Sequence, residues 1–129
     1  MKQDIKGRAD IELLVNTFYH AVLRDKELAY IFTDLAHVNW SHHLPVMYNF
    51  WENIILRTGS YDGNPMTLHQ HLNHIRPLTG MHFRRWDKLF VRTVDKLFTG
   101  PNASLAKERA LCISAILCEN ILADQKYSI

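Results

Sequence analysis

Histidine is the residue type in this chain that could hold a metal ion or a haem iron. The chain contains eight histidines, and five of them fall between His42 and His74. A neutral imidazole is a common ligand of both zinc and haem iron, while histidines on a solvated surface are the competing explanation. The uneven distribution therefore directs the search for a site to this segment.

Three of these histidines, His69, His71 and His74, lie close together in a predicted short helix. Residues two apart in a helix point about 200° away from each other, so at most one or two of the three can face inward. Two apolar stripes compete in this segment, one of which contains His71 and the other His69. Periodicity leaves the choice between these two residues open.

A zinc site is the main alternative for these histidines, and the sequence argues against it. No HExxH or ExxH motif is present, and no cysteine lies near them to complete a tetrahedral set. Cys112 and Cys118 form neither a CxxC nor a CxxCH pattern, which also argues against a covalently attached haem. We interpret both cysteines as small core residues in a reducing compartment.

The helices that must position these side chains follow from apolar residues spaced three and four apart. The spacing predicts a helix over residues 11–23, with Asp10 as its cap, and a brief helical turn over 28–32. The next long helix is expected from near Asn39, and Pro45 suggests that it starts late or bends. Trp40, His43 and Met47 share one face of it.

The second half of the chain shows the same helical spacing. The segment TGSYDGNP predicts an ordered loop, followed by a short helix over 66–74 and a longer one that carries Phe83, Trp86, Phe90, Val94 and Leu97. The segment GPNA then interrupts the chain, and a last helix is expected from about Ser104 to Ala123. Strand-like alternation is absent, so we expect an all-α fold of four longer helices and two short ones.

Three bulky residues with polar tips fall on the inward stripes of different predicted helices: Tyr19, His43 and Trp86. A polar group in a core needs a hydrogen-bond partner. Each of the three could be satisfied separately by a backbone carbonyl, as in many proteins. Their occurrence on three helices instead suggests a shared polar site inside the molecule.

Four motifs in order span nearly the whole chain: FYHAVLRDKELAYIF, NWSHHLPVMYNFWENI, YDGNPMTLH and HFRRWDKLF. In these motifs the chain resembles the truncated haemoglobins, specifically their third group. The resemblance implies a single truncated globin domain over residues 1–129, a helical sandwich around one haem b (iron protoporphyrin IX). The chain departs from the family pattern at Asp87, where a leucine is expected after the tryptophan.

The resemblance also implies roles for individual residues. The histidine that closes PMTLH, His69, matches the family's proximal iron ligand, and Tyr19, His43 and Trp86 match the residues that face the bound ligand and would act in catalysis. His43 could alternatively bind the ferric iron opposite His69. The expected apolar wall of the haem pocket comprises Phe32, Met47, Trp51, Leu72, Leu78 and Phe83. Arg76 and Arg85, unless they are simply solvated, would meet the haem propionates.

The function implied by these residues is binding of O2, NO, CO or peroxide. Bound O2 carries partial negative charge, so several hydrogen-bond donors should slow its release. Slow release favours redox chemistry, such as NO dioxygenation or peroxide activation, with an unidentified reductase as electron donor, over bulk O2 transport. A gas-sensing or interaction module without catalysis is the second hypothesis, and a helical bundle without cofactor is the third.

Composition places further bounds on the protein. With 129 residues, 47% hydrophobic and 22% charged, the chain has the balance of one folded domain. The formal charge of +2 comes from scattered cations, which argues against nucleic acid as a partner. No signal peptide or membrane-spanning run is apparent, so we expect a cytoplasmic monomer or weak dimer without a membrane partner.

Overall fold

The computed structural model describes residues 2–30, 40–57 and 80–127. These ranges contain five helices: α1 (Arg8–Arg24), α2 (Lys26–Tyr30), α3 (Trp40–Leu56), α5 (Gly80–Leu97) and α6 (Pro101–Tyr127). The predicted TGSYDGNP loop and the predicted short helix over 66–74 lie outside the described residues.

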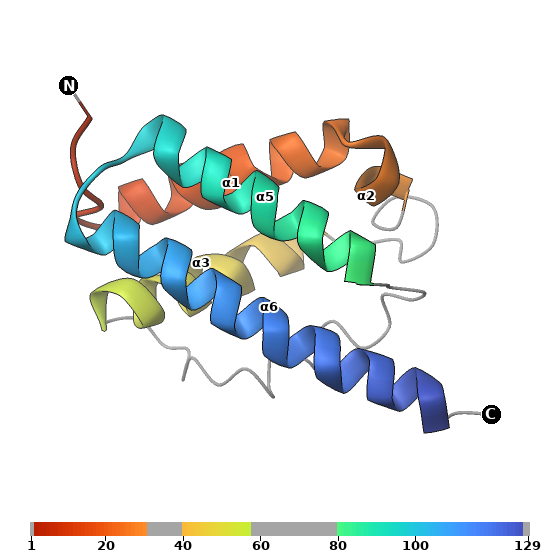
Figure 1. Ribbon diagram of the computed structural model, residues 1–129. Helices are drawn as coiled ribbons and strands as arrows, with labels where there is room; N and C mark the ends of the chain where they lie inside the picture. The colour runs from red at the N-terminus through yellow and green to blue at the C-terminus, as the bar shows by residue number, and fades with distance from the viewer. Residues whose placement is uncertain (1, 31–39, 58–79, 128–129) are drawn as a thin grey trace.

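The four long helices form a sandwich in which each one packs against two others (Figure 1). α1 contacts α3 and α5, while α6 contacts α5 and α3; the short α2 packs against α1 and α5. The largest fully buried side chains come from several of these helices and include Leu14, Phe50, Phe90 and Val94. The expected all-α sandwich is therefore confirmed.

The first helix buries six of the seven residues on the stripe that its spacing predicts, namely Ile11, Leu14, Val15, Phe18, Tyr19 and Val22. The seventh, Leu23, was predicted wrongly, because it is 40% exposed. Its predicted cap was wrong, because the helix begins at Arg8 and Gly7 occupies the N-cap position. Asp10 lies inside the first turn, where its carboxylate accepts a 2.9 Å hydrogen bond from the backbone N–H of Lys6. This carboxylate thus accepts a hydrogen bond from a donor just outside the helix. Its negative charge also interacts favourably with the positive end of the helix dipole.

Pro45 lies inside α3 without delaying its start. Pro45 suggested that the helix starts late or bends, and the late start was wrong, because the helix runs from Trp40 to Leu56. Pro45 has no backbone N–H, so α3 lacks the hydrogen bond to the carbonyl of residue 41. The effect is confined to the first two turns of the helix, where Pro45 is exposed. The helix ends where Arg57 adopts a positive φ of 61°.

The corner between α5 and α6 is held by the N-terminal segment. The carboxylate of Asp4 accepts hydrogen bonds from the backbone N–H groups of Ile5, Asn102 and Ala103 at 2.8–2.9 Å. Asp4 therefore caps α6 from a distant part of the chain. α6 begins at Pro101 rather than near Ser104, because Asp4 caps it there and proline is well suited to the first position of a helix. The helix ends at Tyr127 rather than at Ala123.

We expect this cap to make the protein sensitive to acid. Burial raises the pKa of Asp4, but hydrogen bonds from the three backbone N–H groups outweigh it and hold that pKa below its ordinary value. A carboxyl with a lower pKa in the folded state stabilises the fold fully above its unfolded pKa, about 3.9, and loses that contribution as pH falls through the folded pKa. The free energy of unfolding should therefore fall as pH drops below about 4.

Urea denaturation followed by circular dichroism between pH 7 and pH 2 measures this effect. In Asp4→Asn the side chain no longer titrates, so the free energy of unfolding should fall less steeply with acid than in the wild type. Identical pH dependence in both proteins would show that the Asp4 cap contributes nothing to acid sensitivity.

Candidate functional site

The centre of the candidate site is a hydrogen bond between two buried side chains on neighbouring helices. The hydroxyl of Tyr19 on α1 lies 2.9 Å from Nε2 of His43 on α3, and the imidazole tautomer decides which of the two donates. Tyr19 is 5% exposed and His43 is 3% exposed, so water does not compete for this bond. Arg8 at the start of α1 contacts Glu52 near the end of α3, and Tyr19 contacts His43 near its start, so the two helices run antiparallel.

Trp86 on α5 completes the expected group of three. Its ring lies 5.6 Å from the Tyr19 ring, edge to face, and 4.7 Å from the ring of Phe18. The structure thus brings together all three side chains that the sequence placed on inward stripes. A polar cluster contributed by three helices can be positioned rigidly, because the packing of the sandwich holds each helix against the others.

The environment of Tyr19 keeps its hydroxyl protonated. Burial raises the pKa of Tyr19 far above its ordinary value, because a phenolate in this apolar surrounding would lack solvation. The hydroxyl therefore remains a hydrogen-bond donor at physiological pH. It can donate to His43 or to a ligand placed beside it.

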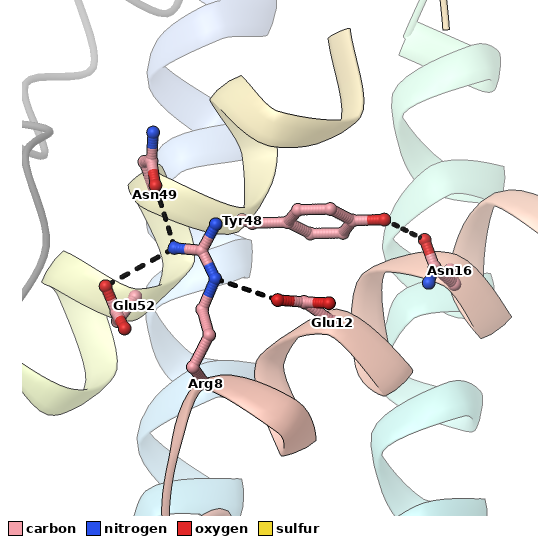
Figure 2. A network of polar contacts seen from close by, with 6 residues as sticks. All are labelled: Arg8, Glu12, Asn16, Tyr48, Asn49 and Glu52. Atoms are coloured by element: carbon pink, nitrogen blue, oxygen red, sulfur yellow. Dashed lines mark hydrogen bonds and ion pairs between the residues drawn. The ribbon is translucent and has the colours of Figure 1, made fainter. Parts of the chain in front are cut away.

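A network of polar contacts joins α1 to α3, the two helices that carry Tyr19 and His43 (Figure 2). The guanidinium of Arg8 donates to Glu12 on its own helix and to Asn49 and Glu52 on α3, at 3.1, 2.7 and 3.4 Å. About two turns further along α1, the hydroxyl of Tyr48 donates to Asn16. These contacts join the two helices at two points along their length.

The residues expected to form an apolar pocket wall are partly described. Met47 and Trp51 are buried on α3, and Trp51 stacks on Phe90 with ring centroids 4.9 Å apart. Phe83 on α5 is partly buried and packs against the same core. Phe32, Leu72 and Leu78 lie outside the described residues.

Arg85, one of the two arginines expected at the haem propionates, has a partner within the protein. Arg85 forms two hydrogen bonds with the carboxylate of Asp25, at 3.0 and 2.7 Å, although its side chain remains 43% exposed. The Arg85 guanidinium and the backbone N–H groups of Glu27 and Leu28 hold the pKa of Asp25 below its ordinary value, although burial works in the opposite direction. A propionate at Arg85 would therefore have to share the guanidinium with Asp25. Arg76 and the expected iron ligand His69 lie outside the described residues, as does His71.

Asp87, the departure from the family pattern, lies on α5 and contacts α6. Burial raises the pKa of its carboxyl, and a hydrogen bond with Ser114 on α6 works in the opposite direction. Its Oδ1 is buried and has no hydrogen-bond partner among the described residues. A leucine here would lack this unsatisfied oxygen, which is the physical difference between this chain and the expected pattern.

Two residues of the site were not singled out from the sequence. Trp40 is partly buried, and its ring lies 5.3 Å from Tyr19 and 5.6 Å from His43. His82 is buried four residues before Trp86, so helical spacing places both on one face of α5. Trp40 precedes His43 by three residues and His82 precedes Trp86 by four, so helical spacing was the signal that could have found them.

One interpretation of the cysteines was wrong, because Cys112 is exposed on α6 rather than buried in the core. Leu111 beside it is 47% exposed as well. The side chain of Cys118 is not described.

Among the helices that are described, none combines the length and the apolar character needed to cross a membrane.

Comparisons with known proteins agree with this architecture. No family model matches the chain. It is 28% identical to a group 3 truncated hemoglobin of Campylobacter jejuni over 118 residues, which are 89% of this chain and 91% of that protein. The crystal structure of a group III truncated hemoglobin from Campylobacter jejuni has a TM-score of 0.77 at 26% identity, covering 94% of this chain and 95% of that one. The resemblance stated from the four motifs and the truncated globin fold are confirmed.

Proposed function

We propose, from the similarity of this chain to group III truncated haemoglobins in both sequence and fold, that it binds one haem b and takes up diatomic ligands at the haem iron. His69 would be the protein ligand of the iron, and O2, NO and CO would bind on the opposite side, beside Tyr19, His43 and Trp86. The observation that carries this proposal is the buried hydrogen bond between Tyr19 and His43 with Trp86 beside it.

This donor set fits the ligand side of a haem. A tyrosine hydroxyl, an imidazole and an indole N–H all offer hydrogen-bond donors, and an apolar wall with Met47 and Trp51 adjoins them. Bound haem would supply an iron that binds a gas molecule and changes oxidation state. The protein's own part is to keep the Tyr19 proton in place, orient the donors and exclude water.

Several donors aimed at one ligand favour retention over exchange. A hydrogen bond stabilises by about 0.5 to 1.5 kcal/mol net, and about 1.4 kcal/mol corresponds to a factor of ten, so two or three bonds slow release by roughly one to three powers of ten. O2 gains from these donors because it accumulates negative charge when bound, whereas CO gains much less. Slow release suits redox chemistry better than transport.

We therefore infer that the protein carries out redox chemistry, either NO dioxygenation or activation of peroxide, and that a reductase returns electrons to the iron. Each of these reactions would place negative charge on an oxygen atom, to which the Tyr19 hydroxyl could donate a hydrogen bond. Haem binding is the first requirement of this proposal. The absorption spectrum of the purified protein, ferric and then ferrous with CO, tests it. A colourless protein that takes up no added hemin would refute the proposal.

Removing the Tyr19 hydroxyl should accelerate O2 release. Tyr19→Phe deletes one donor while keeping the ring, so the O2 dissociation rate should rise roughly two- to tenfold, the equivalent of one bond of about 0.5 to 1.5 kcal/mol. CO dissociation should change less. Stopped-flow displacement of O2 by CO measures the rate.

Tyr48→Phe is the matched control, because it removes a hydroxyl that bonds to Asn16 on the surface rather than to His43. This variant should release O2 at the wild-type rate. Equal rates in Tyr19→Phe, Tyr48→Phe and the wild type would refute a direct role of Tyr19 in holding the ligand.

A further inference from the structure

A second hollow, separate from the proposed haem site, opens between α1 and α5. It has a volume of about 590 Å³ and is lined by α1 residues from Asn16 to Arg24 and by α5 residues from Leu89 to Lys96, with Asp25 at one end. None of the residues assigned to the haem or to its ligands lines it. Surface hollows of roughly 300 to 1,000 Å³ are the size that takes up small molecules.

The lining of this groove is strongly cationic. Arg24, Arg92 and Lys96 are exposed, and within the part of the chain that the structure describes none of them makes an ion pair or a hydrogen bond. Other cations of the chain do have acceptors, such as Lys107 with Asp95 at 2.6 Å. The three groove cations therefore keep their full capacity to bind an anion.

The acidic residue at the groove does not cancel this charge. Both oxygens of the Asp25 carboxylate are occupied by Arg85, which lies outside the lining. Asp25 and Arg85 together contribute no net charge. The groove thus presents three uncompensated positive charges, and two arginine guanidiniums among them can each grip a phosphate or carboxylate with paired N–H groups.

The packing of the two helices spreads these cations along the groove. The Asp25–Arg85 pair joins the end of α1 to the beginning of α5, and the Gln3–Phe98 bridge lies at the opposite ends, so the helices run antiparallel (Figure 1). Arg24 consequently lies toward the beginning of α5 and Lys96 lies toward its end. Arg92 and Lys96 are separated by a rise of about 6 Å along α5. The three cations therefore lie at successive positions along the groove.

We propose that this groove binds a small polyanion that carries at least two phosphate or carboxylate groups. Its volume of about 590 Å³ lies within the range of small-molecule sites. The apolar floor, which includes Ala21 and Leu89, would contact the body of the ligand while the cations hold its charged groups. This site does not depend on haem binding.

Isothermal titration of the full chain with inorganic tripolyphosphate tests the proposal, with citrate as a second probe to separate phosphate from carboxylate ligands. We expect saturable binding of at least one probe with one site per chain, weakened by added salt as screening predicts. The double variant Arg92→Gln, Lys96→Gln should weaken that binding at least tenfold.

The control removes the same charge elsewhere. Lys6→Gln combined with Arg109→Gln also neutralises one lysine and one arginine, and both are exposed residues outside the groove. Binding should stay within about twofold of wild type in this variant, and circular dichroism should confirm that both double variants are folded. Absence of saturable binding by both probes, or equal weakening in the two double variants, would overturn the groove site.

Discussion

Replacing His69 by alanine should abolish axial ligation of the haem and remove or strongly shift the Soret band. The proposed iron would be held to the protein by one coordinate bond from an imidazole nitrogen, so deleting that side chain would leave the haem held only by apolar contacts and by its propionates. Reconstitution with hemin, followed by the absorption spectrum and by gel filtration, measures how much haem stays bound. Free imidazole added to the variant should restore part of the wild-type spectrum, because it supplies the missing ligand to a pocket that is otherwise intact.

His71→Ala is the matched control, since periodicity left His69 and His71 equally eligible and the family resemblance selected His69. This variant should keep the wild-type spectrum. A Soret band lost in His71→Ala but retained in His69→Ala would make His71 the iron ligand and leave the haem proposal standing. A wild-type protein that takes up no hemin would refute the haem proposal itself.

Gly100→Ala should destabilise the fold more than other substitutions at surface positions. Gly100 has a φ of 140°, and a Cβ built there would lie 2.5 Å from Cγ and 2.7 Å from Cβ of Asp4. Backbone strain of about 1 to 3 kcal/mol, with about 1 kcal/mol for the disturbed cap of α6, lowers the free energy of unfolding by about 2 to 4 kcal/mol. Urea denaturation at neutral pH measures this loss.

Gly7→Ala is the control for this substitution, because it places the same methyl group at a helix end where there is open space for it. Gly7 has an extended backbone, with φ of −163°, and a Cβ there meets nothing within 4 Å. Alanine is a poorer N-cap than glycine, so a loss of up to about 1 kcal/mol is expected. Similar losses in Gly7→Ala and Gly100→Ala would show that the contact with Asp4 does not control the corner.

The three side chains of the buried polar cluster could be selected from the sequence because their signals are local. Helical spacing of apolar residues identifies the inward face of each helix, and any polar residue on such a face must meet a partner in the core. Tyr19, His43 and Trp86 could therefore be selected from three separate segments without knowing how those segments pack. Pairing within the group depended on packing, because spacing along one helix carries no information about the next.

The ends of the helices were less predictable, since their caps come from elsewhere in the chain. Asp4 caps α6 across a separation of 98 positions, which moves its beginning from the expected Ser104 to Pro101. Asp25 likewise binds Arg85 across 60 positions. Neither partner can be read from the residues that surround it. The exposure of Cys112 belongs to the same class, because it depends on which side of α6 faces its neighbours.

The residues along the chain were thus enough to establish an all-helical sandwich and to select the polar side chains inside it, because burial of a helix face leaves a repeating pattern in the sequence. The tertiary structure decided which of those side chains touch, which arginine meets an acid and where the last helix begins. Contacts of this second kind join segments far apart in the chain and leave no periodic trace in either one.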